Sequence, residues 1–215
     1  MNRNVLTLCL ALTLPLAAAA EEDRFYVTAD VGANFLGSED LSYRDGITSG
    51  SASADFDPSF AGGATLGWRL NDRWRLEGEL MYRRNEMDDI TLPGVGSSTE
   101  GDFASLSLGA SALYDFNLFG NEDVTSFVGA GVVFVQEIDI DFTVAGQETS
   151  FETDDIGFQV QFGARYDLSD RWFVDARVRY LALSGVELEF PDDTSRIIKA
   201  DYAPLTVSAG IGYRF

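Results

Sequence analysis

The sequence predicts an all-β fold, an eight-stranded antiparallel up-and-down transmembrane β-barrel. Eight segments alternate apolar residues with small or polar ones at a period of two, which is typical of strands whose faces meet different surroundings. The connectors between these segments alternate long and short, as in barrels whose long loops lie on one side of a membrane. Aromatic residues gather where the segments meet the short connectors, as in an interfacial girdle.

The chain has 215 residues, which suits one barrel domain over residues 21–215. Residues 1–20 are predicted to form a cleaved signal peptide, because Arg3 precedes an apolar core that ends in an Ala-rich cleavage site. The alternative is an N-terminal anchor helix, but the apolar run is shorter than the ~20 residues that a span needs. Cys9 is the only cysteine, so the predicted barrel domain has no disulfide and no cysteine-based metal site.

The first four predicted strands each have an apolar and a polar face. They begin near Phe25, Phe60, Trp74 and Ser105. Their apolar positions include Val27, Val31, Leu66, Trp68, Leu76, Leu80, Leu108 and Tyr114, and their polar positions include Asp30, Thr65, Glu77, Glu79, Ser107 and Ser111. The second and third strands are joined by Asn71-Asp72, a pair typical of tight turns.

The last four strands are predicted to begin near Val124, Phe158, Trp172 and Leu205. The fifth is apolar on both faces near its start, so its facing stays open, with a preference for Val128, Ala130, Val132 and Phe134 outward. The last strand alternates most clearly, from Leu205 to Phe215, and its eleven residues match the length of a tilted membrane-crossing strand.

The long connectors follow the odd-numbered strands and are polar. They cover 37–58, 85–102, 141–155 and 182–201, whereas the connectors after the even-numbered strands are short. Both chain ends then lie on the short-turn side, which faces the periplasm in outer-membrane barrels. Two hairpins also share turn chemistry, Leu70-Asn71-Asp72-Arg73-Trp74 and Leu168-Ser169-Asp170-Arg171-Trp172, either by duplication or by convergence.

The apolar face of each strand is predicted to meet lipid. A soluble lipocalin-like barrel would alternate too, with its apolar face inward. Membrane insertion is favoured because no strand carries a charge in the middle of its apolar face. The predicted girdle adds to this, since it consists of Trp68, Trp74, Tyr114, Phe116, Tyr166, Trp172, Tyr213 and Phe215.

Charged residues of both signs are predicted to point into the barrel. The bases are Arg69, Arg75, Arg83, Arg165, Arg177, Arg179 and Arg214, and the acids are Asp30, Glu77, Glu79, Asp115, Asp167 and Asp175. Buried charges are costly alone and tolerated when paired, so their near balance predicts a structural ion-pair network. Because an eight-stranded barrel is only wide enough to be filled by its own side chains, we expect a plugged lumen in preference to an ion path.

The long-loop side of the predicted barrel holds 22 acidic residues, counting Glu137 and Asp139 at strand ends, and only four basic ones, Arg44, Arg84, Arg196 and Lys199. Such loops discourage aggregation by charge repulsion. The alternative is weak binding of Ca²⁺ or Mg²⁺ by Asp88-Asp89, Asp154-Asp155 or Asp192-Asp193, although none has the spacing of a calcium loop. We therefore expect no specific metal site and no cofactor. The acidic surface also argues against nucleic-acid binding, which needs a basic one.

Residues for catalysis are missing from the sequence. There is no histidine, and the known outer-membrane barrel enzymes rely on one as base or partner. Ser105, Ser107 and Ser111 share a face without a base beside them, so they are interpreted as lumen fillers. Glu77 and Glu79 could mimic a carboxylate pair, but the nearby arginines favour ion pairing. We therefore expect no enzymatic activity.

The overall pattern, with the glycine-rich segment 127–132 and the final aromatic pair Tyr213 and Phe215, resembles the small bacterial outer-membrane β-barrel family that includes OmpA-type and opacity-type porin-like proteins. The resemblance implies an eight-stranded barrel in the Gram-negative outer membrane, in contact with its lipid and lipopolysaccharide. It also implies that Tyr213 and Phe215 form an assembly signal for the barrel-assembly machinery. Full OmpA-type proteins have a further peptidoglycan-binding domain, which we do not expect after Phe215.

Three functions are consistent with this pattern. The leading hypothesis is a non-enzymatic integral outer-membrane protein with a structural or surface-interaction role, in which the loops carry any specificity. The second is a narrow channel of the OmpW kind for small or apolar solutes. The third is a soluble periplasmic binder of the lipocalin kind.

Overall fold

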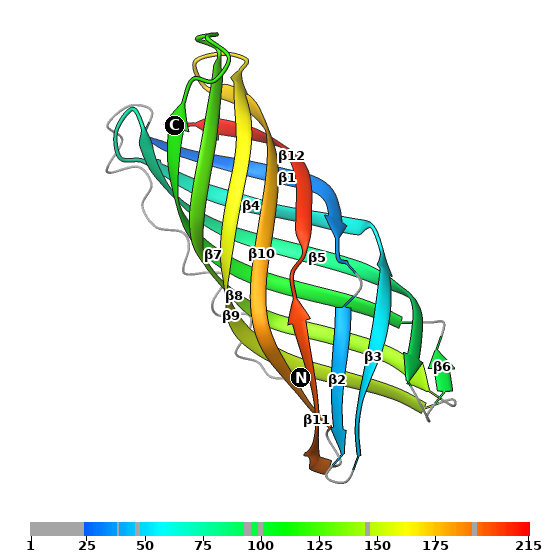
Figure 1. The fold of residues 1–215 in the computed structure, drawn as a ribbon. Helices are drawn as coiled ribbons and strands as arrows, with labels where there is room; N and C mark the ends of the chain where they lie inside the picture. Colours follow the sequence, from blue (N-terminus) through cyan, green and yellow to red (C-terminus); the bar gives the residue numbers. More distant parts are fainter. Residues whose placement is uncertain are drawn as a thin grey trace, which may run out of the picture.

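The computed structural model shows a closed, tilted tube of antiparallel strands (Figure 1). It describes residues 24–37, 39–45, 48–92, 96–98, 101–144, 147–190 and 193–215, so the predicted signal peptide at residues 1–20 lies outside it. Side chains are described for residues 24–37, 57–84, 104–135, 155–183 and 202–215. Within these ranges, the chain contains no helix that is long and apolar enough to cross a membrane.

Eight strands form the barrel wall, in agreement with the predicted fold class. They are β1 (Phe25–Phe35), β4 (Ser59–Arg69), β5 (Trp74–Leu92), β7 (Gly101–Phe116), β8 (Val124–Val144), β9 (Gln147–Asp167), β10 (Trp172–Phe190) and β12 (Leu205–Arg214). Each pairs with the next in this order, and β12 pairs with β1, for example Tyr26 with Arg214. The barrel is therefore closed, and no backbone edge is left open in this part of the wall.

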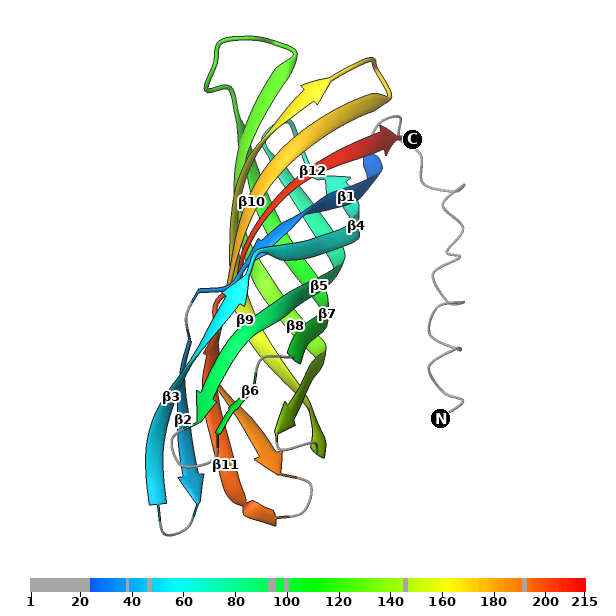
Figure 2. The same ribbon diagram turned by 90° about the vertical axis from the view of Figure 1, so that its right-hand side faces the viewer.

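The long connectors, predicted as polar loops, are largely strand. The additional strands are β2 (Glu39–Asp45), β3 (Thr48–Asp57), β6 (Gly96–Ser98) and β11 (Asp193–Tyr202). At one end of the barrel, β1, β4 and β12 stop at a common level, whereas β5, β7, β8, β9 and β10 continue beyond it. In the gap between β10 and β5, the wall is extended by β11, β2 and β3 (Figure 2). These segments lack alternation because no lipid face is imposed on them, which is why the periodicity missed them.

The apolar face of each barrel strand points outward. Val207 and Ile211 are 43% and 50% exposed, whereas Arg177 and Glu77 are 1% and 4% exposed. This excludes the lipocalin-like arrangement, in which the apolar face is enclosed. The facing of the fifth barrel strand, β8, is also resolved, because Val128 is 47% exposed and its chain neighbour Phe127 is fully buried. The preferred orientation was therefore correct.

Large side chains inside the barrel lie directly opposite glycines of the neighbouring strands. Three such cross-strand pairs involve rings: Tyr26 with Gly67, Phe173 with Gly212, and Phe127 with Gly163. In each pair, a Cβ atom on the glycine would meet the opposing ring. The absence of a glycine side chain therefore makes room for each ring in a narrow lumen.

Replacing Gly67 with alanine should lower the free energy of unfolding by about 1–3 kcal/mol, because the added methyl group overlaps the ring of Tyr26. The matched control is Gly78→Ala on β5, where an added Cβ has nothing within 4 Å. Urea unfolding of the refolded protein, followed by tryptophan fluorescence, measures both variants. Equal shifts of the two midpoints would contradict the proposed packing.

Candidate functional site

The candidate site is the barrel interior, where the structure places nearly all of the charged residues predicted to point inward. Six of the seven bases are buried, namely Arg75, Arg83, Arg165, Arg177, Arg179 and Arg214, and five of the six acids, namely Asp30, Glu77, Glu79, Asp115 and Asp175. Arg69 and Asp167 are half-buried, close to the ends of their strands. We call these thirteen residues the lumen network.

Arg177 is the centre of the lumen network. Its Nη1 atom lies 2.5 Å from one carboxylate oxygen of Glu77, and its Nη2 atom lies 2.8 Å from Asp175. Tyr26 donates a hydrogen bond from its hydroxyl to Glu77. Because Arg177 and both acids are almost fully enclosed, each charge depends on the others to replace water.

A second group of ion pairs surrounds Arg179. Its Nε atom lies 2.7 Å from Glu79, and its Nη2 atom lies 3.6 Å from Asp30. The Nη1 atom donates to the hydroxyl of Ser208 at 2.7 Å. Glu79, which the sequence predicts to be ion-paired, is therefore engaged by an arginine, but by Arg179 and not by the nearby Arg75 or Arg83.

The remaining pairs lie toward the short-turn end. Arg75 Nε lies 3.2 Å from Asp115 and 3.9 Å from Glu77. Arg214 pairs with Asp167, whose side chain is 34% exposed. Arg165 lies 3.7 Å from Asp175, a long distance for an ion pair. Basic and acidic side chains are thus intermixed in this half of the lumen.

Aromatic rings hold the arginines at this end, a role that the sequence analysis did not assign. The guanidinium carbon of Arg165 lies 3.8 Å from the ring centre of Phe173 and 4.5 Å from that of Tyr26. Arg75 lies 4.4 Å from the ring centre of Phe127. Cation–π attraction strengthens when the cation is desolvated, so these rings help to compensate the burial of the bases. The sequence did contain a sign of this role, namely an aromatic residue that alternates with charged residues on the inward face of a strand.

The other half of the lumen contains apolar side chains as well as polar ones. Buried side chains there include Leu36, Ala61, Met81, Val133, Val135, Leu181 and Leu183. Arg83 lies among them and donates to the hydroxyls of Thr206 and Ser107, at 3.2 and 2.8 Å. Tyr202, at the end of β11, shares a hydrogen bond of 3.2 Å with Ser105, and burial raises the pKa of its phenol. The serines predicted as lumen fillers, Ser105, Ser107 and Ser111, are all buried.

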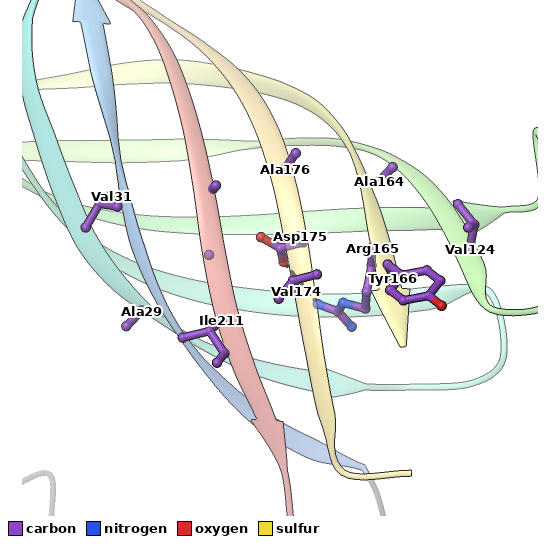
Figure 3. A pocket seen from close by; sticks show the side chains of 12 residues that line it. Ala29, Val31, Val124, Ala164, Arg165, Tyr166, Val174, Asp175, Ala176 and Ile211 are labelled. Atoms are coloured by element: carbon purple, nitrogen blue, oxygen red, sulfur yellow. Dashed lines mark ion pairs between the residues drawn. The ribbon is translucent and has the colours of Figure 1, made fainter. Parts of the chain in front are cut away.

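The outer wall has a groove of about 620 Å³ across β1, β12, β10 and β9. Its floor contains Ala29, Ala164, Ala176 and Ala209, and bulkier side chains such as Ile211 and Tyr166 border it (Figure 3). Arg165 and Asp175 also line it, but they belong to the lumen network (Figure 3). The groove is otherwise apolar, which suits hydrocarbon and offers no group for a reaction.

Tyr213 and Phe215, the predicted assembly signal, lie on the girdle with their rings stacked at 6.5 Å. Of the three aspartate pairs considered for divalent cations, only the side chain of Asp155 lies within the described residues. Among the described side chains, no group of three or more histidine, cysteine, aspartate or glutamate residues is arranged to hold a metal ion.

Comparisons with known proteins agree with this architecture. A family model described as "Outer membrane protein beta-barrel domain" matches residues 5–215. No curated protein matches the sequence significantly. The crystal structure of the outer membrane protein OprG from Pseudomonas aeruginosa is similar, with a TM-score of 0.69, 17% identity, and coverage of 90% of this chain and 97% of that one.

The solid-state NMR structure of the outer membrane protein AlkL in lipid bilayers is also similar. Its TM-score is 0.57 at 18% identity, and the match covers 100% of this chain and 97% of that one. At these identities, both likenesses establish the fold alone.

Arg177→Leu should cost about 3–5 kcal/mol of stability, because it leaves the enclosed carboxylates of Glu77 and Asp175 without their main partner. Arg214→Leu is the control, and its cost should be smaller, because its partner Asp167 can be solvated in part. The urea midpoint of the refolded barrel reports both. If Arg177→Leu keeps the wild-type resistance to urea, the network does not stabilise the barrel.

Proposed function

Since the chain belongs to the outer-membrane protein β-barrel domain family, we propose that it is an integral outer-membrane protein with a non-enzymatic structural or surface-interaction role. One observation carries this proposal most directly, namely that side chains fill the lumen. At mid-barrel, Arg177, Arg179 and Glu77 are each no more than 4% exposed. A filled interior leaves the outer wall and the loops as the working surfaces.

The outer wall supports the membrane part of the proposal. Exposed apolar side chains form a belt around the barrel, including Val31, Phe60, Leu80, Leu108, Val160, Val178 and Ile211. In water such a surface would cause association, whereas lipid covers it at no cost. The aromatic girdle marks the short-turn boundary of this belt, which suits the Gram-negative outer membrane.

The long connectors support the surface-interaction part. Strands β2, β3 and β11 continue the wall well past the ends of β1, β4 and β12, on the side away from the short turns (Figure 2). In outer-membrane barrels this side faces the exterior. The connectors are strongly acidic in sequence, so they favour partners that carry basic groups.

Chemistry inside the barrel argues against an enzyme. The chain has no histidine. A general acid or base must be able to exchange a proton with a substrate, but Glu77 is bound by Arg177 and Tyr26 and is enclosed. Glu79 is likewise held by Arg179.

A narrow channel for small or apolar solutes is the second candidate. It is favoured by the apolar side chains in the half of the lumen away from the short turns, where Met81, Val133 and Leu183 are buried and point inward. The wall there has a junction, which we call the seam, where β1, β4 and β12 end and β11, β2 and β3 take over. At this seam Leu181 donates its backbone N–H to the carbonyl of Pro204 at 3.1 Å. Movement of these side chains would be needed to open a path.

Membrane fractionation and conductance test the proposal together. We expect the protein in the outer-membrane fraction, with gel mobility that changes on heating because the barrel resists unfolding. In planar bilayers the refolded protein should give no steady openings, since the lumen is filled. Steady openings would favour the channel, and recovery of the protein without detergent would contradict membrane insertion.

A further inference from the structure

Two clusters at the short-turn end of the barrel repeat each other. The Arg73 cluster comprises Arg73, Trp74, Tyr114 and Phe116, and the Arg171 cluster comprises Arg171, Trp172, Tyr213 and Phe215. In each, a turn supplies the arginine, and the tryptophan is the first residue of the strand that follows. The tyrosine and phenylalanine come from the end of the neighbouring strand. The shared turn sequences noted above therefore belong to two larger units of similar structure.

The two clusters agree closely in geometry. Arg73 donates from Nη1 to the Tyr114 hydroxyl at 3.4 Å, and Arg171 donates from Nη1 to the Tyr213 hydroxyl at 3.3 Å. The indole and phenol rings meet edge-on in both, with centroids 5.2 and 4.9 Å apart and interplanar angles of 65° and 63°. The tyrosine and phenylalanine rings stack at 6.5 Å in each cluster.

The backbone of the two turns explains this agreement. Trp74 and Trp172 each accept a hydrogen bond at the carbonyl, from the N–H of Leu70 at 2.8 Å and of Leu168 at 2.9 Å. The carbonyl of each arginine accepts a bond from the neighbouring strand, at 2.7 Å for Arg73 and 2.9 Å for Arg171. Each arginine is thereby fixed beside the girdle by its turn.

The clusters lie on opposite sides of the barrel. The Arg73 cluster spans β5 and β7, and the Arg171 cluster spans β10 and β12. In the closed order of the wall, these strand pairs are separated by half of the circumference. The third short turn, residues 117–123, contains neither arginine nor tryptophan, so the arrangement is not a general property of the turns.

Each cluster presents donors at the level where phospholipid headgroups meet the barrel. Arg73 and Arg171 are exposed, and Trp74 and Trp172 are 46% and 48% exposed on the lipid-facing side. A guanidinium offers five N–H donors in a fork that matches phosphate geometry. The tyrosine hydroxyl accepts from the arginine through a lone pair, so its own hydrogen is directed elsewhere. The indole N–H is a further donor.

We propose that the two clusters are equivalent sites for the phosphodiester of a phospholipid in the periplasmic leaflet. The inference rests on the membrane insertion proposed above. The donors of each site hold the phosphate, and the exposed rings cover the adjoining glycerol and upper acyl chain. Asp72 and Asp170 directly precede the arginines, so neither turn has a net charge. Binding therefore depends on short hydrogen bonds more than on a long-range field.

Native mass spectrometry of the refolded full-length protein, titrated in detergent with dimyristoyl phosphatidylglycerol, tests this proposal. The wild type should retain two lipids. Arg73→Gln and Arg171→Gln should each lose one, and the double variant should lose both. Tyr114→Phe and Tyr213→Phe, which keep the ring, should weaken retention at one site each. The control is Arg24→Gln, which removes an exposed arginine from the same end of the barrel and should keep two lipids.

Three results would overturn the proposal. The first is equal retention of lipid by the double variant and the wild type. The second is equal retention of dimyristoylglycerol, which has the same chains without phosphate. The third is displacement of the lipid by millimolar glycerol 3-phosphate, which would identify a site for free phosphate. Heat-modifiable mobility of each variant shows separately that the barrel has folded, so failure of membrane insertion is distinguished from failure of the lipid sites.

Discussion

Closure of the wall is the constraint on which the rest of the structure depends. In hydrocarbon every backbone N–H and C=O must find a partner within the protein, and the pairing of β12 with β1 supplies the last of these. Closure also creates a narrow interior that must be filled. Because the inward faces carry charged residues, filling the interior requires ion pairs such as Arg177 with Glu77.

The lumen combines three means of compensating buried charge. Carboxylates neutralise Arg177 and Arg179, while the rings of Phe127 and Phe173 stack against Arg75 and Arg165. Hydroxyls, including that of Ser208, accept hydrogen bonds from some of the arginine donors. Glycines opposite the rings allow this density of large groups in eight strands. We therefore expect the interior to contribute to stability and any recognition to fall to the outer surfaces, where the loops, the apolar belt and the two arginine clusters lie.

Local features of the barrel follow from the sequence, whereas non-local features do not. Alternation correctly gave the facing of Val207 and Ile211, because exposure to lipid acts on every second residue of one strand. It missed strands β2, β3 and β11, where no lipid imposes the alternation. Nor could it show that Tyr26 lies opposite Gly67, because that depends on the register between β1 and β4.

By itself, the sequence determined the strand faces, the number of barrel strands and the charged composition of the lumen. These follow from periodicity and connector length, which act over a few residues. Only the tertiary structure decided which charges meet. Arg177 and Glu77 are 100 positions apart and come together across the lumen, on strands that are not neighbours in the wall. Such a contact is set by the tilt and register of the closed barrel, and no local pattern encodes it.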